Sequence, residues 1–111
     1  MTLNIERDLP TLEEARRQLL AEIKRAKAQG VRVLKVIHGY GSSGKGGALC
    51  IGLRKSFGLR KKERIIRDFI AGEDFSIFNE TTLALLEAAP ELRGDADLNA
   101  MNEGITILWL T

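Results

Sequence analysis

The sequence is poor in cysteine, in aromatic residues and in long apolar runs. Its 111 residues include one cysteine, Cys50, so no disulfide forms within the chain, which fits a reducing compartment. Aromatic residues make up 5%, which argues against base stacking on an aromatic platform. No apolar stretch approaches the roughly 20 residues that span a bilayer, and the first residues lack the pattern of a signal peptide. We therefore expect a single cytoplasmic domain that does not contact a membrane.

Charge is unevenly distributed along the chain, although the net charge is only +2. Residues 31–67 contain ten basic residues and one acid, a balance of +9, whereas residues 68–111 contain nine acids and one base, a balance of −8. Such polarity predicts a basic patch that faces an anion, with an acidic region beside it. The alternative is that folding interleaves the two segments and neutralises the patch.

Local signals in the first 37 residues predict a strand, a helix and a second strand. Apolar residues alternate at 3–5, as in a strand with one buried face. Thr11 and Glu14 form a capping box, which starts a helix whose apolar stripe recurs at helical spacing until Gly30 ends it. Residues 31–37 are mostly apolar and β-branched, so we expect an inner strand covered on both faces.

The rest of the chain predicts further helices and strands after a glycine-rich loop at 38–47. The expected elements are, in order, a helix from Gly47 or Ala48 that ends or turns at Gly58, a basic connector at 60–64, a strand at 65–70, a helix at 79–89 capped by Asn79 and stopped by Pro90, and a strand at 105–110. The order β-α-β-α-β-(α)-β predicts an α/β fold with helices packed on one small sheet.

The glycine-rich loop joins a buried strand to the start of a helix, a place where α/β proteins bind ligands. Helix N-terminal amides suit a phosphate, glycines allow a close approach, and Lys45 adds a cation. The same glycines are equally consistent with a tight turn that binds nothing. The loop nearly matches a P-loop, but Gly46 replaces the hydroxyl residue that holds magnesium, so we exclude nucleotide hydrolysis.

His38, the one histidine in the sequence, ends the predicted inner strand at the mouth of this loop. In one reading it donates to a phosphate oxygen or serves as a general acid or base, since an imidazole titrates near neutral pH. In the other reading its ring caps the strand and bonds a backbone carbonyl. The residues alone leave both roles open.

The run Val36-Ile37-His38-Gly39-Tyr40-Gly41, after a helix that begins Leu12-Glu13-Glu14-Ala15, resembles the Smr (small MutS-related) domain family. The centre of the resemblance is the HGxG motif at 38–41, and it covers residues 3–70 and 104–110. The family implies a two-layer α/β sandwich, with helices packed on a small mixed four-stranded sheet. It also implies binding to DNA or RNA, which several members nick or cut. We therefore expect one domain over 1–111, with an acidic insertion at 72–102.

On this resemblance, the loop and the basic stretch after it are the expected contacts to phosphate and nucleic acid. These residues are Gly39, Tyr40, Gly41, Ser42, Ser43, Gly44, Lys45, Gly46, Arg54, Arg60, Lys61, Lys62 and Arg64. Cleavage would use His38, assisted by Glu6 or Asp8, and a divalent metal is the one cofactor it implies. The family's N-terminal LDLHG pattern lacks its histidine in this chain, so binding ranks above cleavage. The third candidate is a protein-interaction module that uses the acidic 72–102 segment.

Overall fold

The computed structural model describes the backbone of residues 1–8, 10–40 and 44–111, and the side chains in these ranges except at 8 and 44–46. Its helices and strands, with η for a short 3-10 helix, are β1 (Thr2–Asn4), η1 (Glu6–Asp8), α1 (Leu12–Ala28), β2 (Val33–Ile37), α2 (Gly44–Lys62), β3 (Asp68–Ala71), η2 (Gly72–Asp74), α3 (Glu80–Ala88), η3 (Pro90–Gly94) and β4 (Ile105–Trp109). This order confirms the predicted alternation of strands and helices.

The four strands form one mixed sheet in the order β1-β2-β4-β3. β1 and β2 are parallel, with Thr2 opposite Lys35, and β4 is antiparallel to both β2 and β3. β1, β2 and β3 therefore run in the same direction, and their carboxyl ends meet at one edge of the sheet. The predicted fold class, helices on a small mixed four-stranded sheet, is confirmed.

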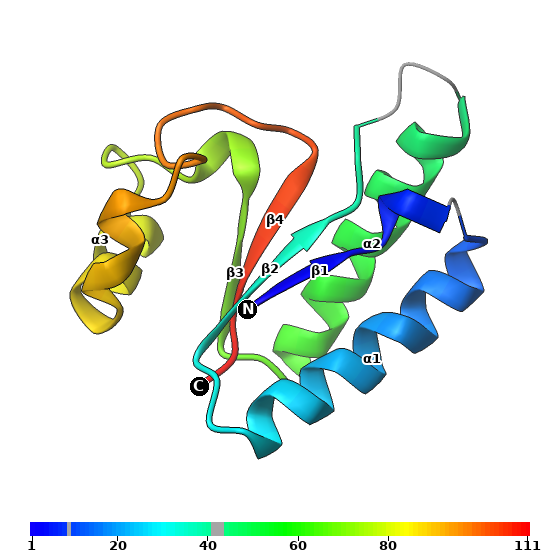
Figure 1. The fold of residues 1–111 in the computed structure, drawn as a ribbon, viewed down its shortest axis with the longest axis horizontal. Helices are drawn as coiled ribbons and strands as arrows, with labels where there is room; N and C mark the ends of the chain where they lie inside the picture. The colour runs from blue at the N-terminus through cyan, green and yellow to red at the C-terminus, as the bar shows by residue number, and fades with distance from the viewer. Residues whose placement is uncertain (9, 41–43) are drawn as a thin grey trace.

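The sheet has a helical layer on each face (Figure 1): α1 and α2 lie on one side, and α3 lies on the other, so the fold has three layers instead of the two that the resemblance implies. The side chains of β4 alternate between the two layers, because successive residues of a strand point to opposite faces. Leu108 packs with α1 and α2, whereas Ile107 and Trp109 pack with the α3 side. Residues 72–102 thus cover the second face of the sheet, with Phe75 and Leu85 fully buried against it.

The helix boundaries predicted from capping signals agree with the structure. Thr11 Oγ1 accepts a hydrogen bond of 3.2 Å from the backbone N–H of Glu14, at the start of α1. Gly30, just after α1, has a φ of 74°. A residue with a side chain adopts this left-handed conformation only at an energetic cost, so glycine is favoured here. Asn79 Oδ1 accepts a 2.9 Å bond from the N–H of Thr82 at the start of α3.

The predicted bounds of the second helix were wrong at both ends. α2 begins at Gly44 rather than at Gly47 or Ala48, and it runs through Gly58 to Lys62. The basic residues 60–62, expected in a connector, form its last turn. A glycine inside a helix costs about 1 kcal/mol, but the fully buried side chains of Leu53 and Phe57 anchor this part of α2 to the core and offset that cost.

The third strand begins later than its sequence predicted, at Asp68 instead of residue 65. Arg64 adopts a left-handed φ of 61°, so the chain turns there before it enters the sheet. Ile66 is nevertheless buried in the core on the side of α1 and α2. In the described part of the chain, no helix is both long enough and apolar enough to cross a membrane.

Candidate functional site

His38 follows β2 and is fully buried, with both ring nitrogens in hydrogen bonds. Nδ1 lies 2.8 Å from the carbonyl oxygen of Gly39, and Nε2 lies 2.9 Å from Thr106 Oγ1 on β4. Since a carbonyl only accepts, we assign the ring proton to Nδ1, which leaves Nε2 to accept from the Thr106 hydroxyl. The ring therefore ties the end of β2 to its neighbour β4.

The environment of His38 favours the neutral ring. Burial lowers the pKa of His38 below its usual 6.5, and the charge of Arg54 lowers it further. The Gly39 carbonyl and the carboxylates of Glu73 and Glu6 act in the opposite direction without overcoming burial. At neutral pH the imidazole is uncharged.

Gly39 needs to be glycine because of its conformation and its neighbours. Its φ is 73°, and the N–H groups of His38 and Gly39 both donate to the carbonyl of Gly104 at 3.0 Å. A Cβ at Gly39 would lie 2.8 Å from the carboxyl carbon of Glu6. The structure therefore brings Glu6, from the end of β1, directly against the HGxG motif.

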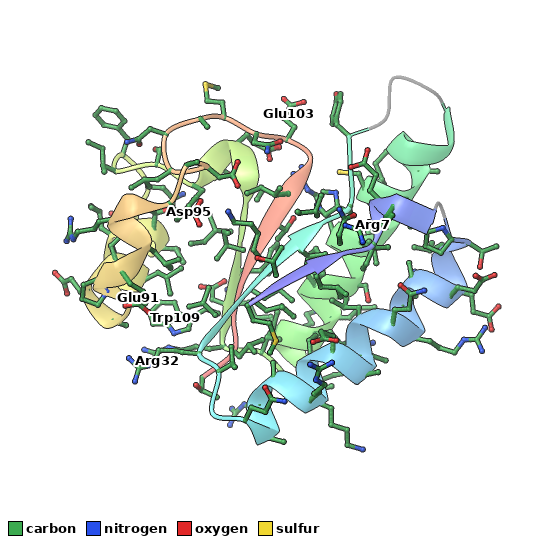
Figure 2. All side chains as sticks on the ribbon, in the orientation of Figure 1. Arg7, Arg32, Glu91, Asp95, Glu103 and Trp109 are labelled. Carbon is green, nitrogen blue, oxygen red and sulfur yellow. The ribbon has the colours of Figure 1, made fainter. Side chains whose placement is uncertain are left out.

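Arg54 of α2 lies beside this corner, where it is held by acidic residues. Its guanidinium donates to both carboxylate oxygens of Glu73, at 2.8 and 2.6 Å, and to the carbonyl of Glu103 at 3.1 Å. Glu103 lies on the turn that leads into β4 (Figure 2). Burial alone would raise the pKa of Glu73, but the hydrogen bonds from Arg54 lower it below its usual value, so this carboxylate stays ionised.

The sequence did not identify Glu73 as a residue of this site. Glu73 follows β3 at the same sheet edge at which Glu6 follows β1 and His38 follows β2. The signal that would have found it is topological: carboxyl ends of strands that run in the same direction meet at one edge. Applying that rule requires the strand order, which no local pattern in the sequence provides.

The other predicted contacts lie at two separate places. Tyr40, within the glycine-rich loop, is 59% exposed, and Gly44, Lys45 and Gly46 begin α2. Residues 41–43, and the side chains of Asp8 and Lys45, lie outside the described part of the structure.

The basic stretch after Gly58 lies at the opposite end of α2 from the loop. A helix of 19 residues is about 28 Å long, so Arg60, Lys61 and Lys62 in its last turn lie roughly 24–27 Å from its start, and Arg64 follows just after it. Arg60 pairs with Glu63 at 3.0 Å and Lys61 with Asp68 at 3.1 Å. Lys62 and Arg64 are exposed. The structure thus divides the expected patch between the two ends of one helix.

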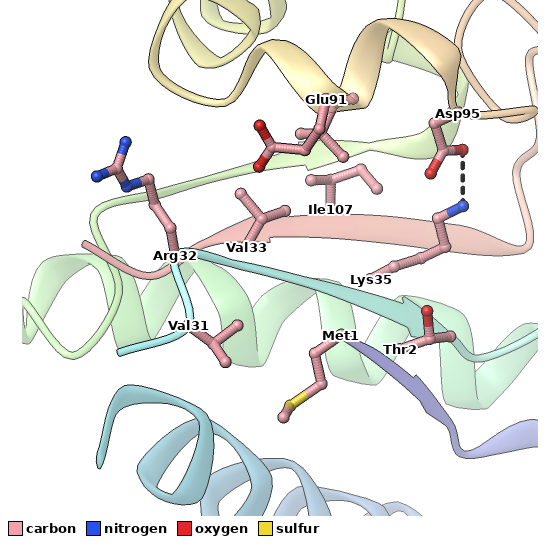
Figure 3. A pocket seen from close by; sticks show the side chains of 10 residues that line it. Met1, Thr2, Val31, Arg32, Val33, Lys35, Glu91, Asp95 and Ile107 are labelled. Carbon is pink, nitrogen blue, oxygen red and sulfur yellow. Dashed lines mark hydrogen bonds and ion pairs between the residues drawn. The ribbon is translucent and has the colours of Figure 1, made fainter. Parts of the chain in front are cut away.

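Folding also neutralises part of the basic segment 31–67. Lys35 on β2 pairs with Asp95 at 2.7 Å and with Asp97 at 2.6 Å, beside a cavity of about 220 Å³ between β2 and η3 (Figure 3). Desolvation lowers the pKa of Lys35, but its two carboxylate partners outweigh this and raise it above the usual 10.5. With Arg54–Glu73 and Lys61–Asp68, three of the nine basic residues of this segment whose side chains are described pair with acids from the second half of the chain.

The described residues contain no group of three or more histidine, cysteine or acidic side chains placed to hold a metal ion. What the site does present is an edge where three strand ends meet. A buried neutral imidazole, a carboxylate against Gly39 and the start of a long helix lie there together.

Comparisons with known proteins agree with the resemblance read from the motif. The model of the Smr domain family matches residues 7–71, which include the HGxG motif. The crystal structure of the Smr domain of Thermus thermophilus MutS2 superimposes with a TM-score of 0.57 at 18% identity, covering 100% of this chain and 95% of that one. At this identity the likeness concerns the fold. No curated protein matches the sequence significantly. Because the family model spans more than half of its residues, the chain belongs to the Smr domain family.

Proposed function

We propose that this domain binds the phosphate backbone of DNA or RNA at the sheet edge that carries the HGxG motif. The observation that carries the proposal is the junction of β2 and α2. Gly39, in a left-handed conformation, is soon followed by the first turn of a 19-residue helix. The first N–H groups of a helix lack partners within it and attract anions. Lys45, in that first turn, adds a cation, and membership of the Smr family supports the same conclusion.

The division of basic residues between the two ends of α2 favours a polymer over a small phosphate compound. A free nucleotide would reach only the loop, whereas a backbone that runs along about 28 Å of helix would also reach Lys62 and Arg64. Phosphates on one strand of duplex DNA recur about every 3.4 Å along the duplex axis, so several would lie along this length. Binding at both ends therefore predicts an affinity that depends on the length of the nucleic acid.

The binding proposal is tested by salt titration with two charge-reversal variants. We expect the wild-type affinity for duplex, branched or single-stranded probes to fall linearly with salt on a double logarithmic scale, because binding releases counterions. Lys45→Glu and Lys62→Glu should each weaken binding to all sequences alike. Each should also make the slope of log affinity against log salt concentration shallower by about one. Arg93→Glu, at an exposed position of η3 on the other face of the sheet, is the matched control.

Electrophoretic shift and fluorescence anisotropy provide the measurement. Binding that is absent at low salt, or that weakens equally in the Arg93→Glu control, would exclude this surface. Equal affinity for a mononucleotide and for an oligonucleotide of about 20 nucleotides would show that the end of α2 that carries Lys62 takes no part in binding.

Cleavage is the second candidate, and the position of Glu6 favours it. The carboxylate of Glu6 lies against Gly39, where it would reach a phosphate bound by the motif and serve as a base that activates water. His38 has both nitrogens engaged in the fold, so it would have to release Thr106 before it could contact a substrate. This geometry is the reason for ranking binding first.

The nicking experiment separates the proposed roles of the two carboxylates and His38. We expect Glu6→Gln to abolish nicking of supercoiled plasmid or structured RNA while binding is retained, because the amide cannot accept a proton from water. Asp8→Asn tests the other acid of the N-terminal segment, and Glu13→Gln, exposed on α1, is the control. Each reaction is run with and without a divalent metal. Nicking that persists unchanged in Glu6→Gln, Asp8→Asn and His38→Gln would belong to a contaminating nuclease.

A further inference from the structure

A cluster of exposed apolar side chains lies at the start of α3. Ile77 is 46% exposed, Phe78 91% and Leu83 44%. Single exposed apolar residues are ordinary, but three within seven positions, one of them a nearly free phenyl ring, form a patch suited to burial against a partner. We call these three residues the α3 knob.

Hydrogen bonds hold the knob in place rather than leaving it as a loose loop. The N–H of Ile77 donates to Asn99 Oδ1 at 3.0 Å, and the N–H of Phe78 donates to Ser76 Oγ at 3.2 Å. Glu80 and Glu87 lie three residues before and four residues after Leu83, on the same exposed side of α3. The backbone of the knob is therefore held in place, and its apolar side chains are flanked by negative charge.

An apolar groove flanked by positive charge lies on α1. It is lined by Leu20, Ile23, Lys24, Lys27 and Ile65, and its volume is about 420 Å³. A cavity of about 150 Å³ already accepts benzene, so the groove has room for a phenyl side chain. Lys27 Nζ donates to the carbonyl of Ile65 at 2.9 Å, which fixes one wall against the other. We call this the α1 groove.

The knob and the groove lie on opposite faces of the sheet (Figure 1), so the knob of one molecule cannot reach its own groove. The two surfaces are complementary: one protrudes and is bordered by glutamates, and the other is hollow and bordered by lysines. We propose that the α3 knob of one molecule inserts into the α1 groove of a second copy of this chain. Because the two surfaces differ, the contact is head-to-tail and can repeat from copy to copy.

This association goes beyond the proposed function, since neither surface includes the HGxG motif or the residues tested for binding. It identifies 72–102 as an assembly segment. The charges favour a second copy over an anionic membrane, which Glu80 and Glu87 would repel.

The proposal is tested by analytical ultracentrifugation of the full chain over a wide concentration range. We expect concentration-dependent growth to species larger than a dimer. Phe78→Ser should weaken association by at least about tenfold, as expected for loss of an aromatic anchor. Leu20→Glu with Lys24→Glu, which places carboxylates opposite Glu80 and Glu87, should do the same. Ile51→Ser, 61% exposed on α2, is the matched apolar control and should associate like the wild type. Circular dichroism verifies that each variant is folded.

Mixing the two defective proteins gives the decisive result. The Phe78→Ser protein keeps an intact groove, and the Leu20→Glu/Lys24→Glu protein keeps an intact knob. Their mixture should therefore form a 1:1 dimer that does not grow further. A wild type that stays monomeric at every concentration, association unchanged in Phe78→Ser, or two variants that do not pair with each other would each overturn the proposal. The proposal would also be overturned if the wild type does not self-associate and the Leu20→Glu/Lys24→Glu protein loses nucleic-acid binding. That result would assign the groove to nucleic acid.

Discussion

Replacing Gly72 with alanine is expected to destabilise the domain by about 3 kcal/mol or more, at the upper end of what one added methyl group does. Gly72 is buried directly after β3. A Cβ there would overlap the carbonyl oxygen of Asn102, and it would lie 2.6 Å from Ile105 Cγ1 and 2.8 Å from the Ile105 carbonyl oxygen. Two of these three atoms belong to the backbone, one at the start of β4 and one three residues before it, so they cannot rotate away as a side chain would. The cost is displacement of a strand inside the sheet.

Urea unfolding monitored by circular dichroism measures this change, with Gly58→Ala as the matched control. Gly58 lies inside α2, and no atom lies within 4 Å of a Cβ built there. The same substitution should therefore stabilise the domain by about 0.5–1 kcal/mol, the difference in helix propensity between the two residues. A Gly72→Ala midpoint within error of the wild type would show that residues 102–105 move freely relative to β3.

The close packing at Gly72 also bears on the site, because Glu73 is the next residue. Glu73 reaches Arg54 only while η2 is held against the start of β4. Moving that backbone would separate the carboxylate from the guanidinium and change the charge beside His38. Gly72→Ala is therefore expected to alter the binding edge as well as stability.

The parts of the fold that could be predicted are those with local physical causes. The caps at Thr11 and Asn79 depend on side chains within three residues of the helix start. The inner strands at 33–37 and 105–109 are mostly apolar, with Lys35 and Thr106 as the exceptions, because helices cover both faces. The bounds of α2 were wrong because Gly47 and Gly58 have low helix propensity. Burial of Leu53 and Phe57, a tertiary effect, overrides that propensity.

The candidate site was less predictable, for the same reason. The HGxG motif is contiguous, so it could be found. The contacts of His38 with Thr106 and of Arg54 with Glu73 join residues 68 and 19 positions apart. Those contacts depend on strand order. The expected basic patch assumed that residues near in sequence lie near in space, whereas a long helix separates them.

The second large effect is a loss of stability on mild acidification, caused by His38. Its pKa is lowered in the folded state, mainly by burial, so the unfolded chain takes up a proton first as the pH falls. Stability is therefore fully present above about pH 6.5 and decreases below it, by up to about 1.4 kcal/mol for each pH unit until the folded protein also protonates. Between these two pKa values the unfolded chain binds more protons than the folded protein, so the free energy of unfolding rises with pH there.

The effect comes from burying the positive charge of a protonated His38, because protonation breaks neither of the hydrogen bonds of the ring. A protonated Nε2 would donate to Thr106 Oγ1, whose hydroxyl can turn and accept, and Nδ1 would keep its bond to the Gly39 carbonyl. What opposes protonation is the absence of solvent around the ring and the positive charge of Arg54.

His38 is the one histidine in the chain, so the window between pH 7 and 5 reports on this ring with little interference. The lowered pKa values of Glu73 and Asp97 place their contributions at more acidic pH. Urea unfolding at half-unit steps should show the wild type losing stability through this window and His38→Gln remaining nearly flat, so that the two curves converge in acid. A wild-type stability that stays constant from pH 7 to 5 would mean that the imidazole is hydrated in solution. It would then be free to meet a phosphate, and cleavage would rank above binding alone.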